Sequence, residues 1–282
     1  MPFKFIRFFA KSGAPRNDPP GPPHEDDIRT NLTIVHTSPE PEIDLVAVHG
    51  WKGHPQDSWT SASGVNWLRD VLPRDMPNIN VYSWGYSFPD SSCAGREPST
   101  HVLSQKLVSD LWQHREDSKT HERPLIFIAH SAGGSIVKSA LLYSGSHPDE
   151  RFHEVKRSTC GVLYMGTPEM DARLEGLESY LANSGGAHAA DDAYFKEASW
   201  LLLTLRQYEG IRQDFRTVYG HEQGPDSVRT HIEGTQTARH LYLNTTHDEM
   251  NKFDSAFDSR YEQVRDGFVW IAQGIRKHDL PS

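Results

Sequence analysis

The sequence predicts an α/β fold, in which helices cover both faces of a mostly parallel central sheet. Short apolar segments with the length of a strand alternate along the chain with longer segments of helical periodicity. One of the short segments, Leu125–Ile128, is apolar throughout, as expected of a strand that is covered on both faces. The length of 282 residues suits one large domain built on a single sheet.

Each predicted strand is a short run rich in apolar residues and bounded by turn residues. The first of them alternates loosely between apolar and polar residues, which favours an edge strand. In chain order the predicted strands are Leu32–His36, Ile43–Val48, Ile79–Trp84, Leu125–Ile128, Cys160–Met165, Phe215–Tyr219 and Val228–Ile232.

The predicted helices carry apolar residues at spacings of three and four. A short helix over Val65–Leu72 is expected to end at Pro73, and His101–Arg115 forms an amphipathic helix. A further helix follows Ser131, and the C-terminal stretch Phe253–Lys277 is helical in pattern.

Residues 171–214 are predicted to form a helical insertion after the strand that ends at Met165. Its position in the chain favours a lid, and its apolar segment Trp200–Leu205 would then line the site as a wall for an acyl chain. The alternative is that this segment packs in the core. The composition of the segment does not discriminate between the two.

Residues 1–30 are predicted to be a flexible N-terminal segment with a linker, and residues 31–282 to be the folded domain. Residues 1–11 are basic and aromatic, with no acidic residue before Asp18. This composition is typical of a peripheral membrane anchor or a mitochondrial presequence, and a disordered tail is the alternative. Residues 17–23 are rich in proline and glycine, as in a linker.

The composition excludes several classes of function. A formal net charge of -9 argues against nucleic-acid binding, which requires a basic face. Although the chain has 16 histidines, none has a convincing metal-ligand spacing with partners, so no metal is expected. Two cysteines, Cys93 and Cys160, do not make a disulfide framework. They indicate an intracellular protein, with the cytoplasm as the expected compartment and a mitochondrial or membrane-associated location as the alternative.

The stretch Ala129–Gly133 has the small-x-Ser-x-Gly form of a nucleophile elbow, with Ser131 at its centre. Such a turn holds the serine in a strained conformation and brings the helix close to the strand. Small residues at Ala129 and Gly133 avoid a clash there. The preceding strand and the following helical pattern supply the expected context. The sequence therefore predicts Ser131 as a nucleophile, and an ordinary serine in a glycine-rich turn is the alternative.

His247 is the best candidate for the base that a nucleophilic serine requires. In α/β hydrolases the chain order is serine, acid, histidine, and His247 lies late in the chain, in a loop before the last helix. His231 and His240 lie within or beside strand-like segments. His221 adjoins the acid candidate itself.

Glu222 is the favoured acid, because it follows the predicted strand Phe215–Tyr219. Asp226, four residues further on, is the alternative acid. Asp214 would lie at the wrong end of that strand. Asp248 adjoins the base and would have to reach around its ring.

An oxyanion hole needs two N–H donors aimed at the substrate carbonyl. The backbone N–H of Ala132, the residue after the nucleophile, is one candidate. The second is the N–H of Trp51, because Gly50 lets the chain turn directly after the early strand. A plain glycine turn is the alternative.

The sequence resembles the α/β hydrolases, and among them the serine active site-containing (lipase-like) proteins and the hydrolase domains of fungal NACHT-type receptors. The resemblance covers roughly residues 43–255 and implies an α/β-hydrolase fold, Ser131 as nucleophile, His247 as base and an acid where Glu222 stands. The similar stretches are Val48–Thr60, Trp67–Pro73, Val81–Tyr86, Ile126–Leu142, Gly161–Pro168 and His247–Phe253.

Taken together, these patterns predict a serine hydrolase that cleaves carboxylic esters of a lipid-like or otherwise hydrophobic small molecule. A serine triad of this kind needs no metal or organic cofactor. An amidase, peptidase or thioesterase would use the same triad. A non-catalytic signalling or interaction module that retains the fold is the alternative from another class.

Overall fold

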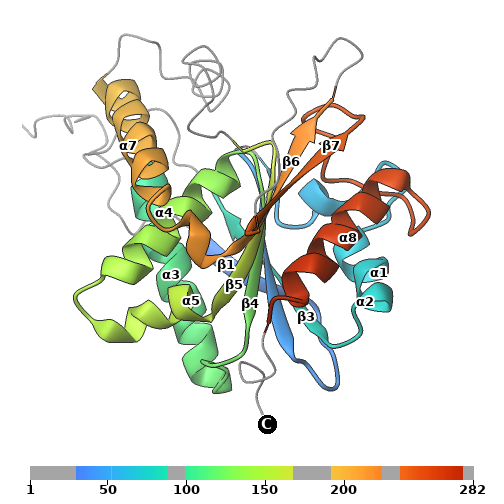
Figure 1. Cartoon of the computed structure of the whole chain (residues 1–282), viewed down its shortest axis with the longest axis horizontal. Coiled ribbons are helices and arrows are strands. Elements are labelled where there is room, and N and C mark those ends of the chain that lie inside the picture. Colours follow the sequence, from blue (N-terminus) through green and yellow to red (C-terminus); the bar gives the residue numbers. More distant parts are fainter. Residues whose placement is uncertain (1–29, 52, 88–98, 168–191, 224–235, 276–282) are drawn as a thin grey trace, which may run out of the picture.

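A seven-stranded sheet forms the centre of the structure, with helices on both of its faces (Figure 1). The strand order is β1-β3-β2-β4-β5-β6-β7. Strand β1 pairs antiparallel with β3, and the other neighbouring pairs are parallel. The computed structural model describes residues 30–51, 53–87, 99–167, 192–223 and 236–275.

The elements have the following bounds. The strands are β1 (Thr30–His36), β2 (Ile43–Val48), β3 (Ile79–Tyr86), β4 (Leu125–His130), β5 (Thr159–Met165), β6 (Arg216–Glu222) and β7 (Ala238–Leu243). The α-helices are α1 (Trp67–Asp70), α2 (Leu72–Asp75), α3 (Ser99–Ser118), α4 (Ala132–Ser146), α5 (His153–Ser158), α7 (Asp192–Tyr208) and α8 (Ser259–Ala272). Short 3₁₀ turns are η2 (Asp57–Trp59), η4 (Glu150–Phe152) and η5 (Arg212–Asp214).

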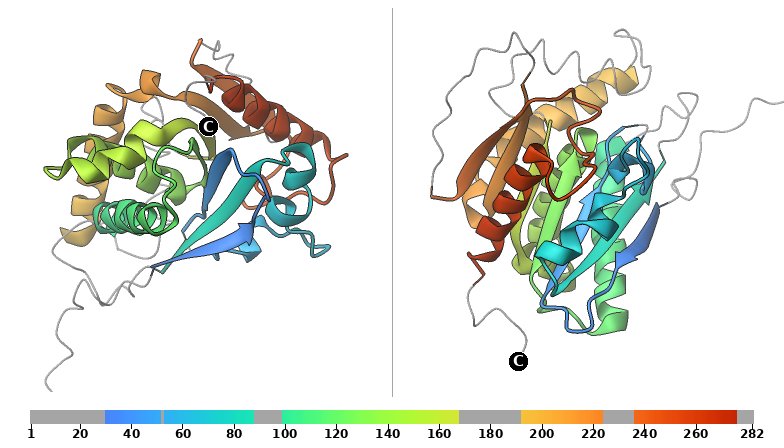
Figure 2. Two further views of the ribbon diagram at one scale, coloured as in Figure 1. Left: turned by 90° about the horizontal axis from the view of Figure 1, so that it is seen from below. Right: turned by 90° about the vertical axis from the view of Figure 1, so that its right-hand side faces the viewer.

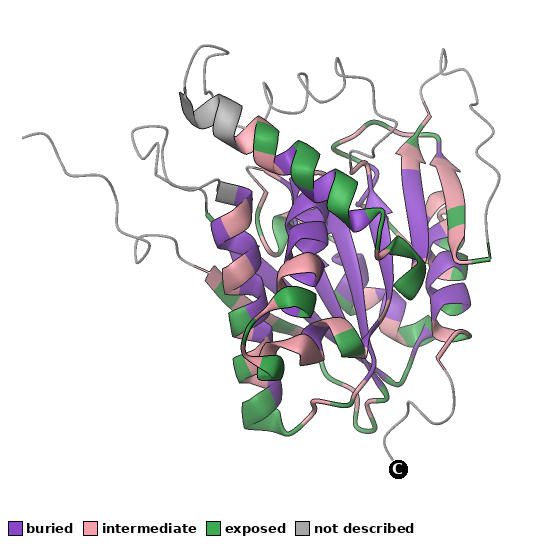
Figure 3. Cartoon of the chain, turned by 60° about the vertical axis from the view of Figure 1, so that its left-hand side comes forward, coloured by how far each residue is buried: buried purple, intermediate pink, exposed green. Residues whose placement is uncertain are grey.

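Two hydrophobic clusters, one on each face of the sheet, form the core. Helices α1, α2 and α8 cover one face, where Trp67 and Phe268 are fully buried. Helices α3 and α4 cover the other face with Leu107 and Ile136, and α7 packs against them. Figure 2 shows the two groups of helices on opposite sides of the sheet. In Figure 3 the buried strands lie between helices whose outer surfaces are exposed.

The predicted fold class is confirmed by this arrangement. The predicted strand Ile43–Val48 coincides with β2, and all residues of β2, β3 and β4 are buried. Burial on both faces is the reason that these strands are recognisable from their apolar sequence alone. The edge position expected for the first strand is also observed, since β1 pairs only with β3.

The prediction of one helix over Val65–Leu72 that ends at Pro73 is wrong. The chain forms α1 and α2 in succession, and Pro73 lies in the first turn of α2. Proline is tolerated there because the N–H that it lacks would have no partner within the helix. Asn66 caps α1 by accepting a hydrogen bond from the Arg69 N–H.

The last strand of the described sheet, β7, is not among the predicted strands. Its sequence includes the polar residues Arg239 and His240, and only Leu243 is buried. A strand at the edge of a sheet is not covered on all sides, so its sequence lacks a continuous apolar run. The predicted strand Val228–Ile232 lies outside the described residues.

The C-terminal helix begins later than the predicted start at Phe253. The Asp258 side chain accepts a hydrogen bond from the Arg260 N–H and caps α8, which therefore starts at Ser259. Phe253 lies in the preceding connection and is fully buried against Trp67. Phe253 therefore packs in the core although its backbone is not part of a helix.

The described part of the predicted insertion 171–214 consists of helix α7 and the stretch that ends with the 3₁₀ turn η5. Leu201 and Leu205 of this helix are buried, whereas Leu202 and Leu203 are exposed, so only one side of the apolar segment packs in the core. Residues 168–191 lie outside the described residues, as do residues 1–29 with their predicted membrane contact, so the lid and the anchor stay predictions. No described helix is both long and apolar enough to cross a membrane.

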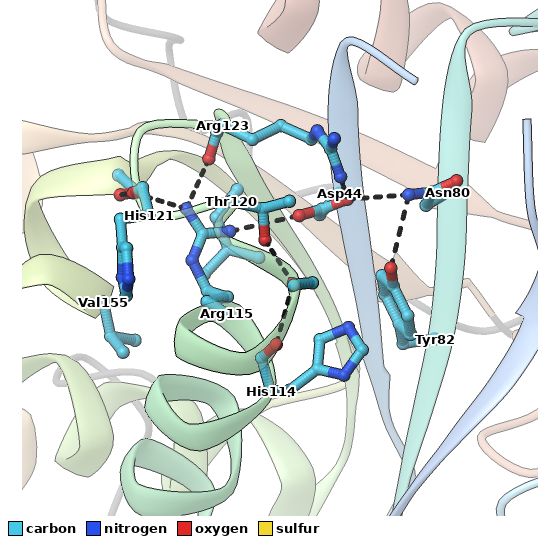
Figure 4. A network of polar contacts seen from close by, with 12 residues as sticks. Asp44, Asn80, Tyr82, His114, Arg115, Thr120, His121, Arg123 and Val155 are labelled. Atoms are coloured by element: carbon cyan, nitrogen blue, oxygen red, sulfur yellow. Dashed lines mark hydrogen bonds and ion pairs between the residues drawn. The ribbon is translucent and has the colours of Figure 1, made fainter. Parts of the chain in front are cut away.

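A buried network of charges joins the C-terminal end of α3 to the start of β2 (Figure 4). Arg115 is 1% exposed and donates to Asp44 at 3.2 Å and to Glu154 at 2.7 Å. The two N–H groups of its other terminal nitrogen, Nη2, donate to the carbonyl oxygens of His121 and Arg123, each at 2.7 Å. Asp44 also accepts from Arg123 and Asn80. The buried guanidinium is thus bonded to two carboxylates and two carbonyl oxygens, and a charge can be buried only with partners of this kind.

Replacing Arg115 with methionine should reduce the free energy of unfolding by about 3 kcal/mol, because Glu154 would lose its guanidinium partner and the buried Asp44 would keep only Arg123 as a cationic partner. Urea denaturation monitored by circular dichroism would measure this. The matched control is Arg151→Met, which removes an exposed ion pair with Asp149 and should leave the urea midpoint unchanged. Equal midpoints for the wild type and the Arg115 variant would contradict the role given to the network.

Candidate active site

The turn between β4 and α4 places Ser131 in the strained geometry of an elbow. Ser131 has φ +50° and ψ −122°, and it is one of two non-glycine residues with positive φ in the described chain. L-residues adopt this region rarely, and such strain persists only where the surroundings enforce it. The Ser131 N–H donates to the Met165 carbonyl at 2.8 Å, and the Ser131 carbonyl accepts from the Thr167 hydroxyl at 3.1 Å.

Gly133 explains why the chain turns so sharply. A Cβ at this position would collide with the carbonyl oxygens of Val48 and His49 at the end of β2. The absence of a side chain lets the first turn of α4 pass against that strand end. Ala129, the other small residue of the motif, is fully buried in β4 and pairs with Val48 and Tyr164.

His247 lies in the connection between β7 and α8, close to Ser131 in space although 116 residues separate the two in sequence (247 − 131). The His247 ring borders Gly166, where an added Cβ would be 2.9 Å from the Nδ1 and Cε1 atoms. Gly166 follows Met165, which accepts the hydrogen bond of Ser131. No hydrogen bond joins the Ser131 hydroxyl to the His247 ring among the described residues. In structures without substrate such bonds are often long.

Glu222 is the last residue of β6, and its side chain is exposed. It pairs in register with Leu243, four residues before His247. Residues 218 and 222 lie on the same face of the strand, because side chains alternate between the two faces. Val218 packs against α8, so Glu222 lies on the face of the sheet that α8 and the β7–α8 connection cover. No hydrogen bond or ion pair joins Glu222 to His247 within the described part of the chain. The alternative acid, Asp226, lies outside it.

The turn after β2 fixes the orientation of the Gly50–Trp51 peptide. The Gly50 carbonyl accepts from the His49 Nδ1–H at 2.8 Å and from the Gly53 N–H at 3.0 Å. The Tyr86 N–H donates to His49 Nε2 at 3.3 Å, so the ring proton of His49 is on Nδ1. Because C=O and N–H point in opposite directions across a planar trans peptide, the Trp51 N–H is directed away from His49 and Gly53.

The Ala132 N–H is the second donor expected from the sequence. Ala132 is the first residue of α4 and is 3% exposed. The first N–H groups of a helix have no partner within the helix, and the helix dipole makes this end electropositive. This N–H is therefore suited to bind an oxygen that gains negative charge.

Two buried histidines beside the site are neutral. Burial lowers the pKa of His49 to about 4, although its hydrogen bond to Gly50 acts in the opposite direction. Burial and the neighbouring His247 likewise lower the pKa of His130 to about 4. No sequence pattern predicts a role for the His130 or Tyr86 side chains. The only signal for His130 was its place inside the elbow, and none existed for Tyr86, which stacks on His49 at 4.2 Å.

Comparison with known sequences finds partial relatives. No family model matches the chain. Protein SERAC1 of Danio rerio is 29% identical over 162 residues, which are 50% of this chain and 23% of the relative. Protein SERAC1 of Mus musculus is 24% identical over 170 residues, which are 55% of this chain and 26% of the relative. The match thus spans about a quarter of the length of these relatives.

Comparison with solved structures agrees with the observed architecture. A soluble variant of monoglyceride lipase from Saccharomyces cerevisiae superposes with a TM-score of 0.50 and 12% identity, over 88% of this chain and 92% of the other. A thermostable carboxyl esterase from Bacillus coagulans superposes with a TM-score of 0.49 and 11% identity, over 88% of this chain and 94% of the other. With the strand order described above, the first of these shows that the chain has the α/β-hydrolase fold.

Replacing Gly133 with alanine should strain the elbow, because the new Cβ meets backbone that cannot move aside. We expect a loss of about 1–3 kcal/mol in the free energy of unfolding, as for other overpacked sites. The measurement is urea denaturation. The control is Gly145→Ala in the same helix, where the Cβ meets only the flexible Lys156 side chain, and it should be no less stable than the wild type. Equal losses in the two variants would contradict the account of the elbow.

The two neutral histidines should make stability dependent on pH. Their ordinary pKa of 6.5 falls to about 4 in the folded protein, so below pH 6.5 the unfolded chain binds protons that the folded chain does not. The free energy of unfolding should therefore decrease as the pH falls from 6.5 to about 4. Urea midpoints measured over this range test the sign. In His130→Gln the free energy of unfolding should decrease less over this range of pH. A decrease equal to that of the wild type would contradict the lowered pKa of His130.

Proposed function

We propose that the protein is a serine hydrolase that cleaves carboxylic esters, with Ser131 as nucleophile and His247 as base. The observation that carries the proposal is the strained backbone of Ser131 at a strand–helix turn, with the His247 ring next to it across Gly166. Strain of this kind concentrates at functional sites. An ordinary serine turn has no need of it.

The proposed reaction proceeds through an acyl-enzyme. Ser131 Oγ attacks the ester carbonyl carbon as His247 takes the hydroxyl proton, and the tetrahedral intermediate then expels the alkoxide, which receives that proton. His247 next takes a proton from water, and the resulting hydroxide attacks the acyl carbon. Ser131 leaves as the alkoxide and recovers its proton from His247. The net reaction converts an ester and water into an acid and an alcohol.

The proposed oxyanion hole consists of the Trp51 and Ala132 N–H groups. The bonds that fix the Gly50 carbonyl support this proposal, because they set the direction of the Trp51 N–H before substrate arrives. Donors that need no reorganisation stabilise the developing charge most effectively. Each donor of this kind contributes roughly 10²–10³ in kcat.

Glu222 is the proposed acid, and its place at the carboxyl end of β6 supports the choice. Asp226 remains the alternative. A negative charge near the His247 ring would orient it and stabilise its cationic form. The exposed position of Glu222 also favours a second candidate function, a non-catalytic interaction module, in which the fold is retained without a working triad.

The proposed substrate is an ester with a hydrophobic, lipid-like acyl group. The support is the similarity to a monoglyceride lipase, which extends over most of both chains. An amide or thioester would react through the same acyl-enzyme. Esters of p-nitrophenol with increasing chain length would rank the acyl groups.

Labelling with a fluorophosphonate probe tests the proposal. The probe should attach to Ser131, identified by peptide mass spectrometry, and the folded Ser131→Ala variant should stay unlabelled. His247→Gln should lower kcat/KM for p-nitrophenyl esters by at least about 1,000-fold, because the serine would lose its base. A folded wild-type protein that takes up no probe and hydrolyses no ester would favour the interaction module.

The two acids can be separated by the matched variants Glu222→Gln and Asp226→Asn. Each removes one negative charge with little change of shape. The variant that lacks the triad acid should lose about 10³- to 10⁴-fold in kcat, and we expect this to be Glu222→Gln. A loss confined to Asp226→Asn would transfer the role to that residue.

A further inference from the structure

His130 lies between the proposed nucleophile and the proposed base. It is the last residue of β4, directly before Ser131, and it is 8% exposed. Its Nε2 atom is 2.9 Å from the His247 carbonyl oxygen, and the two rings are 4.9 Å apart between centroids. The mechanism proposed above makes no use of this side chain.

The hydrogen bond defines the tautomer of His130. A carbonyl oxygen can only accept, so Nε2 carries the proton and donates it to His247. The groups around the ring are His247, Asp248 and Lys252. Only one of these three is an acid, and the ring is removed from water, which favours the neutral form.

His130 also borders the third part of the site. A Cβ on Gly50 would be 3.0 Å from both His130 Nδ1 and Ser131 Cβ. The turn that carries the Trp51 N–H therefore packs directly against the pair His130–Ser131. The Nδ1 edge of the His130 ring thus faces the turn after β2, and its Nε2 edge bonds the loop that carries His247.

The rest of the base loop, residues 244–252, is held independently of His130. Arg260 donates to the Thr245 hydroxyl at 3.1 Å. At the other end, the Asn251 carbonyl accepts from Trp67 at 2.9 Å, and the Asn251 amide donates to the Ser58 carbonyl at 2.6 Å. These bonds anchor the loop on both sides of His247. The bond from His130 is the one that fixes the main chain of the base itself.

We propose that His130 is a positioning residue, whose Nε2–H holds the His247 backbone so that the base and the nucleophile form one unit. Its effect on catalysis rests on the proposed hydrolase function, whereas its effect on the base loop does not. A loss of alignment of about 1 Å costs a reaction about 100-fold. His130 therefore acts through His247 and has no contact with substrate.

The test compares His130→Met with His130→Gln. The two replacement side chains have similar length, but only glutamine can donate a hydrogen bond to the His247 carbonyl. The methionine variant should lower kcat for a p-nitrophenyl ester by about 10- to 100-fold with little change in KM. The glutamine variant should recover most of this loss. Equal kcat values for the wild type and the methionine variant, or equal losses in both variants, would overturn the proposal.

A second measurement is independent of catalysis. In the Ser131→Ala background, hydrogen exchange of residues 244–252 should be faster in His130→Met than in His130→Gln, while peptides from α8 stay unchanged. Unchanged exchange in the loop would overturn the proposal even if the enzyme is active. Faster exchange in a protein that never labels with fluorophosphonate would support the positioning role and refute only the proposed function.

The wild-type protein supplies a check that does not depend on any variant folding. Nitrogen-15 chemical shifts of the His130 ring at neutral pH should show a proton on Nε2 and none on Nδ1. A proton on Nδ1 alone would overturn the proposal, because Nε2 could then not donate to the His247 carbonyl.

Discussion

The close approach between the first turn of α4 and the carboxyl end of β2 determines the geometry of the candidate site. Gly133 allows this approach because a Cβ there would collide with the carbonyl oxygens of Val48 and His49. The chain must then reverse within a single residue, and Ser131 takes a positive φ as a result. The same approach brings the Gly50 turn against Ser131 and directs the N-terminus of α4 to the point where charge would develop.

Neutral histidines organise the site, whereas compensated charges organise the opposite end of the sheet. The lowered pKa of His49 and of His130, from 6.5 to about 4, corresponds to a preference of about 3 kcal/mol for each neutral ring. Each ring therefore keeps one defined donor, and each donor fixes one carbonyl of the site. At the start of β2, by contrast, the buried Arg115 guanidinium is paired with the carboxylates of Asp44 and Glu154.

The fold and the elbow could be predicted from the sequence because their signals are local. The strands β2 to β4 are apolar, and the elbow needs small residues at fixed positions. Strand β7 was not predicted, because an edge strand has no continuous apolar run. The start of α8 was predicted too early, because Phe253 is buried in the core although it lies in a loop. The bond from His130 to His247 spans 117 residues, and no sequence pattern encodes a contact at that distance.

A crystal structure of the protein after reaction with a fluorophosphonate would test the proposed roles of Ser131, Trp51 and Ala132 together. We expect phosphorus bonded to Ser131 Oγ and the phosphonyl oxygen within about 3.1 Å of the Trp51 and Ala132 nitrogens. We also expect a ring nitrogen of His247 within hydrogen-bond reach of Oγ, with the His247 carbonyl still bonded to His130. An adduct on another residue, or an adduct on Ser131 whose oxygen meets neither nitrogen, would contradict the account.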